Sequence, residues 1–188
     1  MITAKTSDDS KDVYTIEDIY NLPDGRHAEL INGEIYMMAT PSRLHQGLIK
    51  EFTYLIEDYI RRKNGNCKIY PSPFAVFLNA DETIYLEPDL SVICDESKLT
   101  EEGCMGSPDW VIEIVSPSSR QRDYVKKMLK YATAGVREYW IVDYDKDCIT
   151  VYDFHNETVE VYSFTDRVKA GIFEELEIDF SKIDLSLL

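Results

Sequence analysis

The sequence predicts an α/β fold in which a mixed central sheet is flanked by helices and carries an added N-terminal β-hairpin. Three observations support this prediction. A strand, a helix and a second strand follow one another between Trp110 and Asp143, an order that implies a parallel strand pair joined by a crossover. A long amphipathic helix precedes several short β-branched or aromatic runs, and an Asn-Gly dipeptide joins two strand-like runs near the N-terminus.

The chain length favours one domain. Its 188 residues, 44% of them hydrophobic, can bury one sizeable core but are too few for two comfortable domains. Residues 1–12 are polar and lack periodicity, so we expect a flexible tail followed by a single domain over residues 13–188. The sequence shows neither a signal segment nor an apolar run near the ~20 residues of a membrane helix. A cytoplasmic location is the expectation.

The N-terminal elements are a short helix and the hairpin. Thr15 followed by Asp18 is typical of a helix N-cap with an acidic first turn. The runs 27–31 and 34–38 flank Asn32-Gly33, a dipeptide that accepts the positive φ angles of a type I′ turn. These two runs are therefore predicted to pair as antiparallel strands.

A long helix and the central strands follow. Apolar residues recur at helical spacing from Ser42 to the Asn64-Gly65 stop, so one face of this helix is expected to pack on a sheet. In the βαβ unit, the helix is expected from about Arg122 to Thr133. Short β-branched or aromatic runs predict the strands: 68–70, 74–78, 90–94, 111–115, 138–142, and a second hairpin formed by 149–154 and 159–164.

The four cysteines, Cys67, Cys94, Cys104 and Cys148, are widely spaced and form no C-x-x-C pair. Such spacing favours neither a zinc site nor a disulfide framework. We expect reduced, partly buried thiols.

Glu113 is the most informative residue for function, because it interrupts an apolar strand of the kind that is covered on both faces. An ionised carboxylate there needs a bound metal, a lysine or a raised pKa. Asp89 begins another strand-like run, and two acids on neighbouring strands can share one Mg²⁺ ion, which prefers carboxylate and water ligands. The alternatives are a strand-edge turn residue at Asp89 and a structural ion pair at Glu113.

Several motifs carry a family resemblance. Pro88-Asp89 followed by Glu113-Ile114-Val115 resembles the motif of PD-(D/E)XK nucleases, with Val115 in place of the usual lysine. More narrowly, the chain resembles the bacterial Uma-two family of restriction endonucleases. The matching segments cover nearly everything after the tail: Glu29–Glu34, Pro41-Ser42 with His45, Pro88–Ser91, Val111–Ser118, Lys127 with Tyr131, and Gly135–Asp143.

The resemblance implies a restriction-endonuclease-like fold and a metal-dependent endonuclease acting on nucleic acid, with DNA as the first candidate. Asp89 and Glu113 would hold Mg²⁺ or Mn²⁺, with the Ile114 carbonyl as a further ligand. Glu34 and His45 also match family positions. Glu34 would supply an oxygen to the metal shell or form a cross-strand charge pair. His45 would bind a phosphate oxygen or simply be satisfied by backbone at the start of its helix.

In the family, a lysine on the following helix replaces the missing strand lysine, and Lys127 matches that position. Rises of ~1.5 Å per helical residue and ~3.3 Å per strand residue place Lys127 nearly level with Glu113. The direction of the Lys127 side chain is less favourable for a contact with Glu113. At ~100° per residue the helix has an apolar face on the side opposite Lys127. Adding Tyr124 and Tyr131 to this face moves Lys127 to its flank, and a surface pair with Asp123 is the alternative role. The residues of the apolar face are Val125, Met128, Leu129 and Ala132.

The charge balance restricts the function. With 20 basic and 35 acidic residues, the net charge is −15, which repels phosphate backbones. Nucleic-acid binding would need a local basic patch, predicted at Arg120, Arg122, Lys126, Lys127 and Lys130. The charge and Val115 together favour an alternative, a catalytically inactive nuclease-fold module for binding or assembly. A glycoside hydrolase would fit the acid pair but not the family motifs. A homodimer is expected, because cleavage of a duplex needs two sites.

Overall fold

The computed structural model describes residues 13–117 and 119–186. The predicted tail of residues 1–12 lies outside this part of the chain, and the assignment of residues 13–188 to a single domain stays a prediction. The long helix is α2 (Arg43–Arg62), and a short helix, α1 (Ile16–Tyr20), opens the described region with the expected N-cap at Thr15 and an acidic first turn. None of the helices in the described residues is long and apolar enough to cross a membrane.

A six-stranded mixed sheet forms the centre of the fold, in the order β10-β9-β8-β7-β5-β3. Only β7 and β8 run parallel, while the other neighbouring pairs are antiparallel. The predicted α/β class and the parallel pair of the βαβ unit are thus confirmed. The strand bounds are β3 (Lys68–Pro71), β5 (Leu90–Ile93), β7 (Trp110–Ile114), β8 (Glu138–Asp143), β9 (Cys148–Asp153) and β10 (Thr158–Tyr162).

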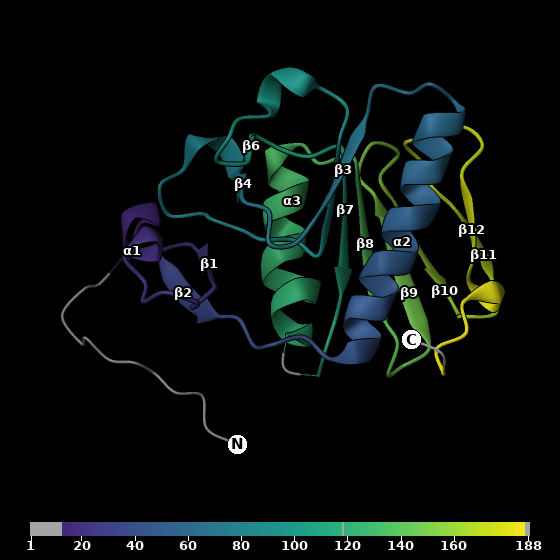
Figure 1. Ribbon diagram of the computed structural model, residues 1–188, viewed down its shortest axis with the longest axis horizontal. Helices are drawn as coiled ribbons and strands as arrows, with labels where there is room; N and C mark the ends of the chain where they lie inside the picture. The colour runs from purple at the N-terminus through teal and green to yellow at the C-terminus, as the bar shows by residue number, and fades with distance from the viewer. Residues whose placement is uncertain (1–12, 118, 187–188) are drawn as a thin grey trace.

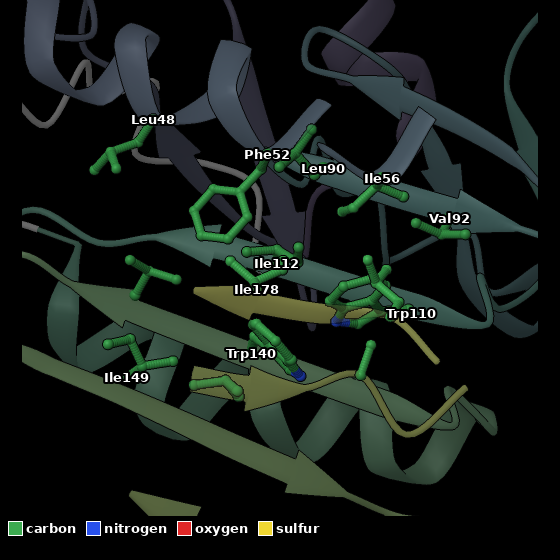
Figure 2. Close-up of a cluster of buried hydrophobic side chains, with 14 of the residues drawn as sticks. Leu48, Phe52, Ile56, Leu90, Val92, Trp110, Ile112, Trp140, Ile149 and Ile178 are labelled. Carbon is green, nitrogen blue, oxygen red and sulfur yellow. The ribbon is translucent and has the colours of Figure 1, made fainter. Parts of the chain in front are cut away.

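Two helices cover the two faces of this sheet (Figure 1). Helix α2 packs against one face, where Phe52 points toward Ile112 and the two tryptophans of the core (Figure 2). The helix that ends in α3 (Met128–Ala134) covers the other face, with Tyr131 packed against Tyr139. Both helices begin at the end of the sheet where β7 finishes (Figure 1). Strands β5, β7 and β8 are consequently buried along their whole length.

The predicted hairpin is present as β1 (Ala28–Ile31) and β2 (Glu34–Met37). Asn32 and Gly33 take φ angles of 54° and 74°, the left-handed values that a type I′ turn requires. Leu30 exchanges two backbone hydrogen bonds with Tyr85, which ties the hairpin to the segment before β5. The hairpin is therefore anchored beside the strand that carries Asp89.

The crossover helix begins with a π-helical segment, Arg122–Lys127, and continues as α3 until Gly135 ends it with a φ of 90°. Its position agrees with the prediction, but the π winding was not predicted. A π-helix bonds i to i+5 and holds more residues per turn than an α-helix.

The remaining elements are peripheral. The second predicted hairpin is formed by β9 and β10. The predicted strand 74–78 is reduced to β4 (Val76–Phe77), which pairs with β6 (Cys104–Met105) outside the central sheet. Near the C-terminus, β11 (Arg167–Lys169) pairs with β12 (Glu177–Asp179). Short 3₁₀ turns occupy Leu78–Ala80, Glu96–Lys98 and Phe180–Lys182.

The expectation of four reduced cysteines is wrong for one pair, because Cys67 and Cys94 form a disulfide. The antiparallel register of β3 and β5 pairs Lys68 with Ile93, so the next residue on each strand is a cysteine and the two lie opposite each other. The two cysteines are neighbours only because of the register between β3 and β5, which their spacing along the chain does not indicate. Cys104 and Cys148 are free thiols.

Candidate active site

Asp89, the residue before β5, lies across from Glu113 of the antiparallel neighbour β7. The register pairs Leu90 with Ile112, and extending it by one residue brings Asp89 across from Glu113, a position in which both side chains point to the same face. Asp89 Oδ2 also accepts a hydrogen bond from the Ile114 backbone N–H at 2.7 Å. The structure thus brings together the two acids that were expected to share a metal ion.

Glu113 is almost completely buried and has two hydrogen-bond donors on one oxygen. Oε1 accepts from Lys127 Nζ at 2.8 Å and from the Tyr131 hydroxyl at 3.0 Å. Burial raises the pKa of Glu113 well above its ordinary value, Lys127 lowers it, and the nearby acids raise it further. The raised pKa means that binding of a proton or of a further cation at this carboxylate is favourable.

Lys127 is 2% exposed, and three carboxylates surround its ammonium group. Nζ lies 2.7 Å from Glu29 Oε1, 2.8 Å from Glu113 Oε1 and 3.5 Å from Asp123 Oδ1. Burial by itself lowers the pKa of Lys127, but the three carboxylates outweigh it and leave the pKa raised. Lys127 is thus a permanent cation that donates hydrogen bonds.

The apolar face predicted for this helix is wrong. Val125 and Leu129, assigned to the buried face, are 50% and 54% exposed, and the pair of Lys127 with Asp123 is buried. The buried residues Asp123, Lys127 and Tyr131 recur at i,i+4 spacing, which is one side of a helix. The error therefore lay in assigning the apolar residues, and not this charged side, to the sheet.

Glu29 was not predicted as a site residue, although it is the most deeply buried acid of the cluster. Its exposure is 0%. Oε1 accepts a hydrogen bond from the Glu87 backbone N–H at 3.2 Å, and Oε2 lies 3.5 Å from Arg122 Nε. The sequence contained the same signal for Glu29 as for Glu113, because both are acids within an otherwise apolar strand. The hairpin therefore contributes to the site.

His45 reaches Asp89 from the first turn of α2. Its Nε2 lies 3.2 Å from Asp89 Oδ2, and its backbone N–H donates to the N-cap side chain of Ser42 at 3.1 Å. Burial lowers the pKa of His45, but the hydrogen bond and charge of Asp89, together with a hydrogen bond to the Ile114 backbone, raise it overall. Nδ1 is buried and has no hydrogen-bond partner among the described residues.

Comparisons with known proteins found a family and a solved structure that are similar to this chain. A family model described as "Putative restriction endonuclease", Uma2, matches residues 16–181. The chain belongs to the Uma2 family. This confirms the resemblance to the Uma-two family drawn from the motifs. The search of curated proteins found no match.

Among solved structures, the fold of this Uma2 chain resembles that of a "putative nuclease belonging to DUF820" from Anabaena variabilis ATCC 29413. The TM-score is 0.74 at 22% identity, and the match covers 89% of this chain and 95% of the other. At this identity the likeness shows the fold. The predicted restriction-endonuclease-like architecture is therefore confirmed.

Glu34 lies apart from the acid pair of the Uma2 site. It is exposed, and its contacts are an ion pair with Lys126 at 2.8 Å and a hydrogen bond with the Tyr36 hydroxyl. The hydrogen bond from Lys126 is the main cause of the lowered pKa of Glu34. The structure thus places Glu34 in a surface ion pair.

The predicted basic patch is not a free cationic surface. Arg120 forms a bidentate pair with Asp143 at 2.6 and 2.7 Å, and three further cations of the patch also face carboxylates. These three are Arg122, Lys126 and Lys127. The patch was predicted from the density of basic residues along the chain, whereas the fold distributes four of its five members between the interior and separate ion pairs.

The donor set of the Uma2 site fits a divalent cation. Asp89 Oδ1 and Glu113 Oε2 accept no hydrogen bond from the part of the chain that the structure describes. Three carboxylates contact the two permanent cations Lys127 and Arg122, which leaves an excess of negative charge. Among the described residues, no three His, Cys, Asp or Glu side chains are grouped as a metal site. Two carboxylates completed by carbonyl and water suit Mg²⁺.

Proposed function

We propose that this chain is an endonuclease that hydrolyses phosphodiester bonds of nucleic acid, with DNA as the first candidate and Mg²⁺ or Mn²⁺ as the cofactor. One observation carries the proposal. Asp89 faces Glu113 across neighbouring strands, and the ammonium group of Lys127 lies 2.8 Å from Glu113. The description of the Uma2 family and the fold of the Anabaena nuclease support the same interpretation.

In this proposal Asp89, Glu113 and the Ile114 carbonyl would hold the ion. When bound, a divalent ion lowers the pKa of water and offsets charge on the phosphoryl group. Asp89 is fixed by its hydrogen bond from the Ile114 N–H, and Glu113 by Lys127 and Tyr131. Both carboxylates are consequently held in place before any ligand arrives.

Lys127 takes the role that a strand lysine would have at position 115. Because the raised pKa keeps its ammonium group protonated, Lys127 orients the attacking water by hydrogen bonding and stabilises negative charge that develops on the phosphate. His45 lies on the other side of Asp89, and its raised pKa favours the cation. We assign to His45 a hydrogen bond to a phosphate oxygen. Glu34 takes no part in this mechanism.

A catalytically inactive module is the second candidate, and two observations favour it. Val115 occupies the usual lysine position, and all three carboxylates around Lys127 already engage its ammonium group. Such a module would keep the fold and bind a partner without turnover. The predicted homodimer and cytoplasmic location belong to either candidate and stay predictions.

A cleavage assay on single-stranded and duplex DNA, with Mg²⁺, Mn²⁺ or EDTA, separates the two candidates. We expect metal-dependent cleavage that falls more than about 100-fold in Asp89→Asn and Glu113→Gln, since loss of mere supporting residues at metal sites already costs ~10–100-fold. Glu101→Gln, at an exposed acid, is the matched control. Undiminished cleavage in both Asp89→Ala and Glu113→Ala would exclude the mechanism. An inactive module would show no saturable Mn²⁺ binding dependent on Asp89 in calorimetry.

A further inference from the structure

A groove of about 610 Å³ runs along the outer side of α2, beside the end of β3. Its helical wall is formed by residues that recur at i+3 and i+4, from Gln46 in the first turns to Arg61 in the last. This spacing is one continuous face of the helix. At ~1.5 Å per residue the wall is ~22 Å long.

One end of the groove adjoins the candidate active site. Ser72 lines the groove, and its backbone N–H donates to the Asp89 carbonyl at 3.0 Å. Gln46 lines it from α2 and follows His45, whose Nε2 contacts Asp89 Oδ2. The groove therefore ends beside Asp89.

Two side chains of the groove, Tyr54 and Lys50, are exposed and available to a ligand. Tyr54 is 66% exposed and makes no ring contact or hydrogen bond within the described residues. Lys50 lies one turn before Tyr54, is exposed, and has no ion-pair partner in the same part of the chain. An aromatic platform next to a cation is the combination that binds single-stranded nucleic acid.

The acids of the groove do not oppose such a ligand strongly. Glu57 pairs with Arg61 at 2.6 Å and Asp58 with Arg62 at 2.8 Å, each at i,i+4 spacing. Lys50 is left as the unpaired charge of the lining, which otherwise includes apolar surface from Ile49 and Pro71. The protein as a whole carries a net charge of −15, but the acids of this groove are paired and Lys50 is not. The groove therefore repels a nucleotide strand less than the net charge suggests.

We infer that the groove between α2 and β3 binds a single strand of nucleic acid, with a base stacked on Tyr54 and a phosphate on Lys50, and guides it to Asp89 and Glu113. The inference rests on the proposed nuclease function and specifies its substrate as unpaired strand. At a rise of ~3.4 Å per nucleotide, the wall accommodates about six stacked nucleotides. A duplex keeps its bases paired and stacked, so it offers Tyr54 no free base face.

Binding in EDTA tests the inference without cleavage. We would measure fluorescence anisotropy of labelled single-stranded DNA of about 12 nucleotides, twice the length of the groove wall, RNA of the same sequence, and the DNA duplex. We expect the single strands to bind more tightly than the duplex, and Tyr54→Ala to weaken their binding about tenfold, since stacking on one aromatic side chain contributes ~1–3 kcal/mol. Tyr54→Phe should bind normally. Lys50→Ala should weaken binding and reduce the salt slope by about 1.

Tyr20→Ala is the matched control, because Tyr20 on α1 is 63% exposed and lies outside the groove lining. Equal binding by Tyr54→Ala and the unchanged protein would overturn the inference, and so would a preference for duplex. A shift from dimer to monomer in Tyr54→Ala, with unchanged strand binding, would also overturn it and would assign the groove to a second copy of the chain. Cleavage that survives loss of Asp89 and Glu113 contradicts only the nuclease mechanism, so the two failures can be told apart.

Discussion

Glu29 Oε1 lies 2.7 Å from Lys127 Nζ, so a carboxylate of the N-terminal hairpin reaches the ammonium group that stands beside Glu113. The hairpin is a separate two-stranded sheet, yet one of its strands supplies the closest contact of the central lysine. Positioning of Lys127 consequently depends on an element outside the six-stranded sheet.

Removing Glu29 should destabilise the fold. Glu29→Ala leaves Lys127 and Arg122 with one carboxylate fewer in a buried site, and breaking a buried pair costs about 3–5 kcal/mol. Glu34→Ala on the same hairpin removes only an exposed pair with Lys126, for which about 0–1 kcal/mol is usual. Urea unfolding of both variants measures the difference, and equal losses would contradict a buried role for Glu29.

The two sides of the crossover helix should respond in opposite ways to substitution. Val125→Lys and Leu129→Lys place charges at exposed positions, so we expect the unfolding free energy to change by no more than about 0.5 kcal/mol. Lys127→Met should cost about 3 kcal/mol or more, because it leaves three buried carboxylates without their cation. Unfolding curves for the three variants decide the matter. A large loss in Val125→Lys would restore Val125 to the buried face that the sequence predicted.

Stability of the metal-free protein should decline as pH rises. Burial raises the pKa of Glu113 above 4.5, and for His45 the bond with Asp89 outweighs burial and raises the pKa above 6.5. The folded protein thus binds more protons than the unfolded chain, so both contributions are complete below these ordinary values and are lost as pH passes the raised ones. Unfolding in EDTA between about pH 5 and 8 measures the trend. Glu113→Gln should flatten it, and stability that rose over this range would refute the assignment.

The disulfide should stabilise the fold measurably. Cys67 and Cys94 are separated by 27 positions, and closing a loop of that size typically contributes about 2–4 kcal/mol. Reduction, or Cys67→Ser, should lower the unfolding free energy by this amount, whereas Cys148→Ser, at a free cysteine, should have a small effect. Thiol titration of the denatured, unreduced protein should find two thiols, Cys104 and Cys148. Four thiols would show that no bond forms.

The fold was largely predictable because its signals are local. Asn32-Gly33 specified the hairpin through its backbone preference, and the apolar repeat of Arg43–Arg62 specified the long helix. The pairing of Asp89 with Glu113 could be anticipated from two acids at strand positions and from the family motifs. Their alignment across the sheet became visible only in the register of β5 and β7.

The parts that were not predicted depend on long-range geometry. Glu29 and Glu113 lie far apart along the chain, yet in space they share the ammonium group of Lys127. The apolar residues of the crossover helix could not reveal that its buried side carries Asp123 and Lys127, because the partners of these two residues come from other elements. The disulfide between Cys67 and Cys94 likewise follows from strand register, which no local pattern encodes.

The crossover helix presents Asp123, Lys127 and Tyr131 on one buried side, at i,i+4 spacing. Inserting or deleting one residue at the start of this helix would rotate that side by ~100° and would bring a neighbouring residue to the carboxylates in place of Lys127. Glu113 would keep its place in β7. Chain length before one helix is therefore a control on the site that is separate from the chemical identity of any side chain.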